Sequence, residues 1–263
     1  MMSDVTFIQV GDLANGFEHA SHLVSRSDEL AGRTFKLYFK EKQPMRLALL
    51  PGELLHFNSY EYLSYRCTSI RESIYFIDFL DPDNPRGTIT IILDVSLNLV
   101  TLIYGQLPTA DQVSVSAFSR IKQNVSLTDV DVCILFGTAK ILTTDDQLHH
   151  FTDELIGYRN QYIYSSTEKY EHIYLNENFY AWHCIEGVEK GLADVDRCHY
   201  IKISEKLYLF IWREKIVPTL GVILIDMKLL RTDGKILGYQ EEDFKALTNF
   251  QVGSYAKILH SIV

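Results

Sequence analysis

The stretch KLYLFIWREK at residues 206–215 decides the fold, because aromatic, apolar and charged side chains alternate along it as they do along a β-strand. One face of this strand would carry Tyr208, Phe210, Trp212 and Glu214. A second stretch of the same kind, SIYFIDFLDP, occupies residues 73–82 and aligns Tyr75 with Tyr208. The sequence therefore presents the same aromatic strand twice.

Three further segments recur in the same order along the chain. DELAG at 28–32 returns as DELIG at 153–157, TITIILD at 88–94 as TLGVILID at 219–226, and FGTAKIL at 136–142 as VGSYAKIL at 252–259. Collinear matches of this kind indicate an internal duplication. We expect a lead-in segment at 1–27, a first domain at 28–145, and a second domain at 150–263 that holds the candidate active pocket.

Short segments rich in Tyr, Phe and β-branched residues, separated by turn signals, are typical of all-β domains. PDNP at 82–85 predicts a turn, and Asp233-Gly234 between two apolar stretches predicts a hairpin. Helix is expected only in short pieces, such as 145–153. The expected fold class is mainly β: two tandem antiparallel β-barrels of the lipocalin-like (calycin) kind with short helical linkers. A two-sheet sandwich is the alternative, but a barrel of about eight strands has an interior that holds one small ligand.

The composition restricts the classes of partner. The 263-residue chain carries 25 Lys and Arg against 34 Asp and Glu, a formal net charge of -9, which argues against nucleic acid or an anionic membrane surface as a partner. The N-terminus does not resemble a signal peptide, and no apolar run approaches the roughly 20 residues of a membrane span. We expect a cytoplasmic protein whose cysteines, Cys67, Cys133, Cys184 and Cys198, are free thiols. The expected partner is a small-molecule ligand or substrate, and a homodimer is compatible with these features.

Long segments of the second copy carry a family resemblance. HCIEGVEKGLADVDRCHYIKI at 183–203, LYLFIWREKIVPTLGVILIDM at 207–227 and GKILGY at 234–239 resemble the C-terminal domain of the MoaF family. The first copy resembles the N-terminal domain of the same family. The family name is expanded as molybdenum cofactor biosynthesis protein F. The chain has no pterin-binding or metal motif, so we expect no cofactor.

A more distant resemblance concerns chemistry. The second copy is similar to the phenolic acid decarboxylases, cofactor-free enzymes on a lipocalin-like barrel, whose first strand carries a Tyr-x-Tyr pair and a later strand a Trp-x-Glu run. Tyr162 and Tyr164 match the pair, and Trp212 and Glu214 match the run. The resemblance implies that the tyrosines hydrogen-bond a substrate carboxylate and that Glu214 handles protons. Where that family has an arginine, this chain offers Lys190, which lacks the bidentate fork of a guanidinium.

The first copy departs from this pattern. Leu37 and Phe39 stand at the tyrosine positions, Phe79 at the tryptophan position and Asp81 near the glutamate position. The first barrel therefore lacks the two phenol hydroxyls that would donate to a carboxylate or phenolate. We expect one ligand site per chain, in the second barrel.

The candidate catalytic residues are Glu214, Tyr162 and Tyr164. Burial of Glu214 among aromatic side chains would poise it as an acid or base, whereas at the barrel rim it would pair with Arg213 or Lys215. The two tyrosines could equally be packing residues of a strand. The candidate ligand-binding residues are Tyr170, His172, Tyr174, Trp182, Lys190, Tyr208, Phe210 and Trp212. Among these, His172 is either a proton shuttle or a structural histidine.

No metal site is expected, because the adjacent pairs His183-Cys184 and Cys198-His199 would point to opposite faces of a strand. The interpretation adopted is a protein that binds an aromatic or carboxylated molecule in its second barrel, with cofactor-free acid–base chemistry on that molecule as an extension. The alternative is a cofactor-independent lyase, decarboxylase or isomerase that uses Glu214 and the tyrosine pair. A scaffold for a partner enzyme is a third reading.

Overall fold

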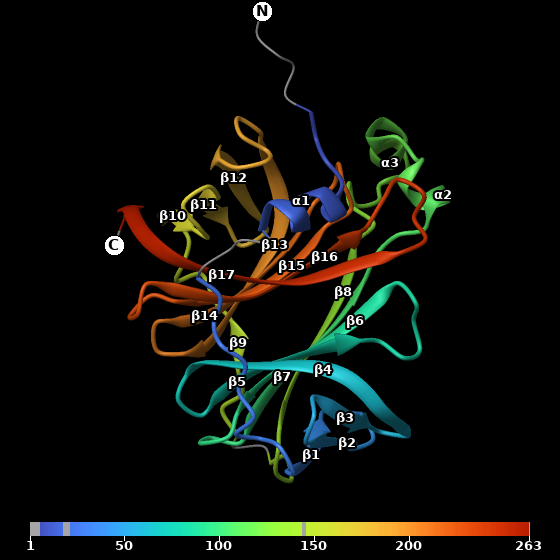
Figure 1. Ribbon diagram of the computed structural model, residues 1–263, viewed down its shortest axis with the longest axis vertical. Helices are drawn as coiled ribbons and strands as arrows, with labels where there is room; N and C mark the ends of the chain where they lie inside the picture. Colours follow the sequence, from blue (N-terminus) through green and yellow to red (C-terminus); the bar gives the residue numbers. More distant parts are fainter. Residues whose placement is uncertain (1–5, 18–21, 144–145, 263) are drawn as a thin grey trace, which may run out of the picture. The chain divides into compact units, whose positions relative to one another are not determined.

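The computed structural model describes residues 6–17, 22–143 and 146–262 and contains two closed antiparallel β-barrels of eight strands each (Figure 1). The expected mainly β architecture of two tandem barrels is confirmed, and a two-sheet sandwich is excluded. The four cysteines are free, as expected. Within the described ranges, no helix combines the length and the apolar character needed to cross a bilayer.

The first barrel arranges its strands in chain order. They are β1 (Thr34–Phe39), β2 (Met45–Leu50), β3 (Leu54–Phe57), β4 (Tyr60–Arg71), β5 (Ile74–Leu80), β6 (Gly87–Asp94), β7 (Leu99–Gln106) and β8 (Asp131–Thr138). Pairing of β1 with β8 closes the ring. The interior is filled by aliphatic side chains and phenylalanines such as Leu37, Leu47, Leu55, Ile77 and Phe79. Because these side chains carry no polar atoms, they form an ordinary hydrophobic core.

The second barrel has the same strand order. Its strands are β10 (Arg159–Ile163), β11 (Lys169–Asn176), β12 (Phe179–Glu186), β13 (Ala193–Ser204), β14 (Leu207–Arg213), β15 (Leu220–Asp226), β16 (Arg231–Tyr239) and β17 (Leu247–His260). β10 pairs with both β11 and β17, and the additional pairing of β12 with β13 completes the ring. The two-residue strand β9 (His150–Phe151) precedes this barrel in the chain.

The hydrogen-bond register also repeats between the barrels. Leu47 on β2 lies opposite Phe57 on β3, and His172 on β11, 125 residues later, lies opposite Trp182 on β12. The aromatic strand that appears twice in the sequence is the fifth strand of each barrel, β5 in the first and β14 in the second. The duplication predicted from the sequence is therefore present in strand order and in register.

Three short helices accompany the barrels. They are α1 (Val10–Phe17), α2 (Ala110–Val113) and α3 (Ala117–Gln123). The segment 107–131, which contains α2 and α3, and helix α1 belong to the compact unit of the second barrel, although both precede that barrel in the sequence. Helix α1 packs against β16 and β17, among other parts of the second barrel. Residues from distant parts of the chain thus complete the second-barrel unit.

Two local predictions were wrong. The expected helix at 145–153 is replaced by irregular chain and by β9, while Asp145 lies outside the described residues. The expected hairpin at Asp233-Gly234 lies inside β16, and the chain reverses at residues 227–230 instead. Gly234 allows close approach of a neighbouring strand, because a Cβ there would lie 2.2 Å from the carbonyl oxygen of Val222. The predicted turn at 82–85 is confirmed between β5 and β6.

The repeated Asp-Glu-Leu-x-Gly motif has a structural role in both barrels. Glu29 accepts a hydrogen bond from the Tyr75 hydroxyl at 2.5 Å, and Glu154 accepts one from the Tyr208 hydroxyl at 2.7 Å. The leucine of each motif is fully buried, and each glycine has a positive φ, +81° at Gly32 and +88° at Gly157. The motif therefore makes the same turn before the first strand of each barrel and ties it to the fifth strand.

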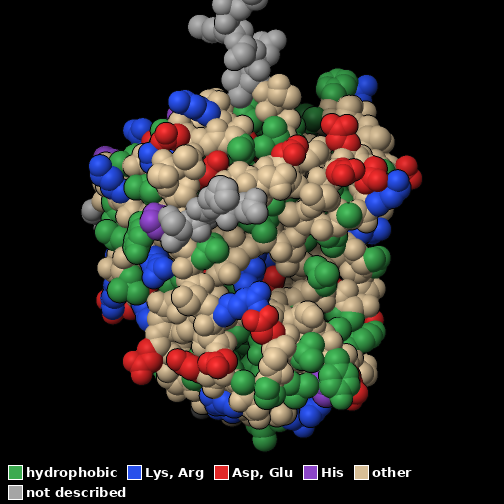
Figure 2. Space-filling model, viewed as in Figure 1, with side chains coloured by type: hydrophobic (Ala, Val, Ile, Leu, Met, Phe, Trp, Pro, Cys, Tyr) green, Lys and Arg blue, Asp and Glu red, His purple; other side chains and the backbone are tan. Residues whose placement is uncertain are grey.

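Charged groups of both signs cover the surface. On the face shown in Figure 2, acidic and basic side chains are interspersed among apolar ones. Some form ion pairs, such as Arg159 with Glu171 at 2.8 Å and Lys228 with Glu205 at 3.0 Å.

Candidate ligand-binding site

The interior of the second barrel is lined by aromatic rings rather than by aliphatic side chains. Tyr162, Tyr164, Tyr170, Tyr174, Tyr180, Trp182, Tyr200, Phe210 and Trp212 all belong to one buried cluster. A cavity of about 30 Å³ remains inside it, lined by side chains from β11, β12, β14 and β16, by Tyr164 and by α1. That volume holds one or two water molecules. The interior of the barrel is therefore nearly filled, and the small remaining space is lined mostly by aromatic rings.

Helix α1 contributes one wall of this cavity. Its side chains Leu13 and Phe17 line the space. The Phe17 ring packs edge-on against Tyr164, with ring centroids 4.9 Å apart, and its centroid lies 5.7 Å from that of Phe250 on β17. A ring from outside the barrel thus occupies a position among the barrel's own aromatic side chains.

Glu214, directly after β14, lines the cavity with its neighbour Trp212. Its Oε1 atom accepts a hydrogen bond from the Trp212 indole Nε1–H at 2.8 Å. Burial raises the pKa of Glu214 well above its usual range, and the charges of Asp196 and Glu189 raise it further. Glu214 is thus a half-buried acid of the cavity wall that is hydrogen-bonded to Trp212.

The two neighbours of Glu214 have other partners. Lys215 forms ion pairs with Asp194 at 2.6 Å and with Asp196 at 3.3 Å. Arg213 donates to the backbone carbonyl of Val130 at 3.2 Å. Neither cation therefore neutralises the Glu214 carboxyl, which explains why burial governs its pKa.

Glu189 is a second acid in the cavity wall, and sequence reasoning did not identify it. Its Oε2 atom accepts a hydrogen bond from the Tyr170 hydroxyl at 3.1 Å, and burial raises its pKa to about 7. The adjacent Lys190, predicted to bind the ligand, is exposed and does not line the cavity. The turn between β12 and β13 breaks the alternation of the strand, because Gly187 and Gly191 both have positive φ.

His172 on β11 lies at the centre of the aromatic cluster. Its ring centroid is 4.9 Å from that of Tyr162 and 5.1 Å from that of Tyr180. The residue is 4% exposed, and its Nδ1 atom has no hydrogen-bond partner in the protein. Burial lowers the pKa of His172 to about 3, so the imidazole is neutral at physiological pH. Burial of this polar nitrogen without a hydrogen-bond partner destabilises the folded state.

The other predicted residues lie behind the cavity or away from it. The Tyr162 and Tyr174 hydroxyls bond to each other at 2.5 Å, and Asn160 also donates to Tyr162. Phe210 stacks between Tyr200 and Trp212. Tyr208 bonds to Glu154, as described above. The structure therefore brings six predicted residues to the cavity: Tyr164, Tyr170, His172, Trp182, Trp212 and Glu214.

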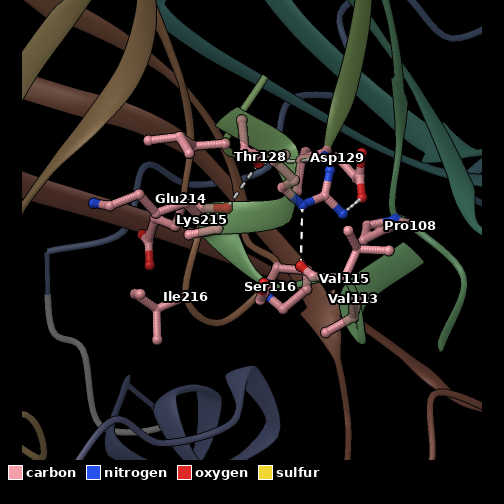
Figure 3. Close-up of a pocket in the computed structure, with 14 residues that line it drawn as sticks. Pro108, Val113, Val115, Ser116, Thr128, Asp129, Glu214, Lys215 and Ile216 are labelled. Atoms are coloured by element: carbon pink, nitrogen blue, oxygen red, sulfur yellow. Dashed lines mark hydrogen bonds and ion pairs between the residues drawn. The ribbon is translucent and has the colours of Figure 1, made fainter. Parts of the chain in front are cut away.

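A larger cleft of about 260 Å³ lies on the outer side of Glu214 (Figure 3). It is formed by residues of the 107–131 segment and by the chain that follows β14. The Thr128 hydroxyl donates to the backbone carbonyl of Glu214 at 2.9 Å, and Arg120 is held by an ion pair with Asp129. Because Glu214 lines both the cleft and the cavity, it lies at the boundary between them.

Comparison with known proteins identifies the family. One family model, the MoaF N-terminal domain, matches residues 5–109, and another, the MoaF C-terminal domain, matches residues 149–262. The chain belongs to the MoaF family. Protein MoaF of Klebsiella aerogenes is 49% identical to this MoaF family member over 260 residues, covering 99% of this chain and 98% of that protein. The resemblance seen in the sequence is confirmed over nearly the whole length.

A solved structure shows a much weaker match. A putative beta-lactamase from Burkholderia vietnamiensis covers 40% of this chain and 95% of its own, with 9% sequence identity and a TM-score of 0.34. Similarity at this level transfers neither fold nor activity to the MoaF family.

The candidate site combines residues from both MoaF domains. Leu13 and Phe17 fall in the range of the N-terminal model, whereas the barrel residues fall in that of the C-terminal model. The described residues contain no group of three His, Cys, Asp or Glu side chains arranged to hold a metal ion. The polar groups at the cavity are the carboxyls of Glu189 and Glu214, the neutral imidazole of His172 and the hydroxyls of Tyr164, Tyr170 and Tyr180.

Proposed function

We propose that the second barrel of this MoaF family member binds a small organic molecule that carries an aromatic ring. The observation that carries this proposal is the Nδ1 atom of His172, which is buried among aromatic rings without a partner. Buried polar atoms are nearly always hydrogen-bonded, and unpaired ones often mark functional sites. A ligand with a polar group beside its ring would supply the partner and fill the space around it.

The size of the cavity limits how such a ligand is received. Ligand pockets usually have volumes of about 300–1,000 Å³, and the cavity here measures about 30 Å³. Phe17 shows that an aromatic ring is accommodated against Tyr164 and Tyr170, with centroids 4.9 and 6.0 Å away. The ligand ring therefore takes the place of the Phe17 ring, and α1 is displaced when it binds.

The experiment uses the two tryptophans of the chain, Trp182 and Trp212, because both line the cavity. Their emission is followed while benzyl alcohol, benzylamine or benzoate is added. A saturable change with at least one probe is expected. His172→Leu should weaken that binding about tenfold, as expected for one lost hydrogen bond of roughly 1.4 kcal/mol. The matched first-barrel variant Leu47→Val should bind as the wild type does. Emission that responds to none of the three probes would refute the proposal.

A second candidate function is a cofactor-independent lyase, favoured by the raised pKa of Glu214. A protonated Glu214 would deliver its proton to the carbon that loses the carboxylate, while the C–C bond breaks and CO₂ leaves. Tyr164 shares the cavity with Glu214, whereas the Tyr162 hydroxyl is occupied by Tyr174 and Asn160. Of the predicted pair Tyr162 and Tyr164, the tyrosine available to a substrate is therefore Tyr164.

The lyase candidate is tested with a hydroxycinnamate, whose conversion to the vinylphenol is followed by absorbance. Turnover that disappears in Glu214→Gln, with binding retained, would support it. Absence of turnover in the wild type at saturating hydroxycinnamate would leave binding as the function.

A further inference from the structure

We infer that the ligand of the second barrel is an aromatic amine, a molecule whose ring is joined to a protonated nitrogen. This inference rests on the proposed binding function and specifies the chemical class of ligand. It follows from three features of the cavity: the sign of the charges around it, the aromatic rings that line it, and the unpartnered nitrogen of His172.

The charged groups at the cavity are acidic. Glu189 and Glu214 line it, and Asp196 accepts a hydrogen bond from the indole of Trp182, another lining residue, at 2.9 Å. No Lys or Arg is found among the described residues that line the cavity, and Lys215 in the outer cleft is already paired with Asp194 and Asp196. A bound ammonium group would favour the ionised form of both acids and be attracted to them, whereas a carboxylate ligand would find no opposite charge at the cavity.

The aromatic lining is suited to a cation as well. Trp182 and Trp212 face the cavity together with Tyr164, Tyr170 and Tyr180. A cation over the face of a tryptophan or tyrosine is stabilised by the negative quadrupole of the ring, and desolvation strengthens the effect. Each indole N–H is already engaged, one by Asp196 and the other by Glu214, so the ring surface is what remains for a ligand.

The imidazole of His172 is the third feature that favours an amine. Because it is neutral, one ring nitrogen is an acceptor, and Nδ1 has no partner in the protein. An ammonium group carries only donors, so it matches two carboxyl groups and the tautomer of His172 in which Nδ1 is the acceptor. A neutral alcohol has a single donor and no charge, so it could donate to only one of these three groups and would not be attracted by ionised acids.

The test compares benzylamine, benzyl alcohol and benzoate, which share one ring and differ in charge, by titration of tryptophan emission at pH 7.5. Benzylamine should bind at least tenfold more tightly than benzyl alcohol, and benzoate should bind most weakly. Glu189→Gln and Glu214→Gln should each weaken benzylamine binding about tenfold and weaken benzyl alcohol binding much less. The matched control Asp81→Asn, at the corresponding place in the first barrel, should change neither.

The outcomes distinguish failure of the amine inference from failure of the proposed binding function. Equal or tighter binding of benzyl alcohol or benzoate would overturn the amine inference and leave the binding function in place. Benzylamine binding that is unaffected in both Gln variants would overturn it as well. A lack of any emission change with all three probes would overturn the binding function itself.

Discussion

The two barrels have the same strand order and register, yet one has an inert core and the other a polar cavity. At matched positions the first barrel has Leu47 and Phe79 where the second has His172 and Trp212. The first set forms a hydrophobic core, and the second lines a cavity that also contains acids. Two barrels of the same strand order and register therefore differ in the chemistry of their interiors.

The larger side chain in the second barrel requires a compensating change on the neighbouring strand. Phe79 lies opposite Ile89 in the first barrel, whereas Trp212 lies opposite Gly221 in the second. A Cβ atom on Gly221 would lie 2.1 Å from ring atoms of Trp212. No side chain fits at residue 221 while the indole of Trp212 occupies that space.

The largest expected effect comes from exchanging one matched pair. Leu47→His should lower the free energy of unfolding of the first-barrel unit by about 3 kcal/mol or more, because it places an unpaired polar ring in an apolar core. His172→Leu should act in the opposite direction and stabilise the second-barrel unit by about 1–3 kcal/mol while weakening ligand binding about tenfold. Urea unfolding measures both. A marked loss of stability in His172→Leu would show that the imidazole is structural.

The second prediction concerns the pH dependence of stability, which Glu189 should confer on the second-barrel unit. The folded-state pKa of Glu189 is about 7 against an ordinary value of 4.5, so the folded state holds this proton more tightly. This contribution to stability is complete below about pH 4.5 and is lost as the pH rises through about 7. The loss is on the order of 3 kcal/mol. The groups around Glu189 are Tyr170, Cys184, Glu168 and Glu214.

Unfolding measured between pH 5 and pH 8 tests this prediction. Glu189→Gln should flatten the pH dependence of the second-barrel unit. Glu186→Gln is the control, because the partner Lys169 lowers the pKa of Glu186 and its removal should leave the slope in place. An unchanged slope in Glu189→Gln would assign the effect to another group.

The third prediction removes the Phe17 ring of α1, which packs inside the second barrel. Phe17→Ala should raise the affinity for benzyl alcohol about tenfold, because the ligand ring no longer displaces the Phe17 ring. Tryptophan emission again provides the measurement. Phe39→Ala, which removes a buried ring from the first-barrel core, should cost stability and leave affinity unchanged. Weaker binding in Phe17→Ala would mean that α1 forms part of the occupied site.

The smallest expected effect lies where the barrels are alike. Tyr75→Phe and Tyr208→Phe each remove a hydrogen bond to a partly exposed glutamate, so each should destabilise its own unit by about 1 kcal/mol. Neither should alter ligand binding. A selective loss of binding in Tyr208→Phe would restore the interpretation of this tyrosine as a ligand contact.

The sequence was sufficient for features that depend on local alternation and repetition. The barrels, the duplication and the inward direction of Trp212 and Glu214 follow from period-two patterns. The repeats also distinguish structural residues from site residues. Tyr208 has a counterpart in Tyr75, which points to a shared structural role. His172 has no polar counterpart in the first copy. Differences between the copies mark the candidate site better than their similarities do.

Features that depend on long-range contacts could not be predicted. Phe17 reaches the cavity from the start of the chain, and the 107–131 segment reaches the outer cleft from a position between β7 and β8. Glu189 was missed because the glycines of its turn break the alternation on which strand reasoning depends. Asp233-Gly234 resembled a turn because glycine serves close backbone approach as well as chain reversal.

The position of α1 in the chain has a consequence for protein synthesis. The ribosome makes α1 first, but the last strand that it contacts, β17, begins only at Leu247. At roughly 5–20 residues per second, those intervening residues take about 10–50 s to translate. During that interval Leu13 and Phe17 have no second barrel to bury them, and the first barrel can complete all its strands. Helix α1, although synthesised first, is therefore among the last elements to pack into the fold.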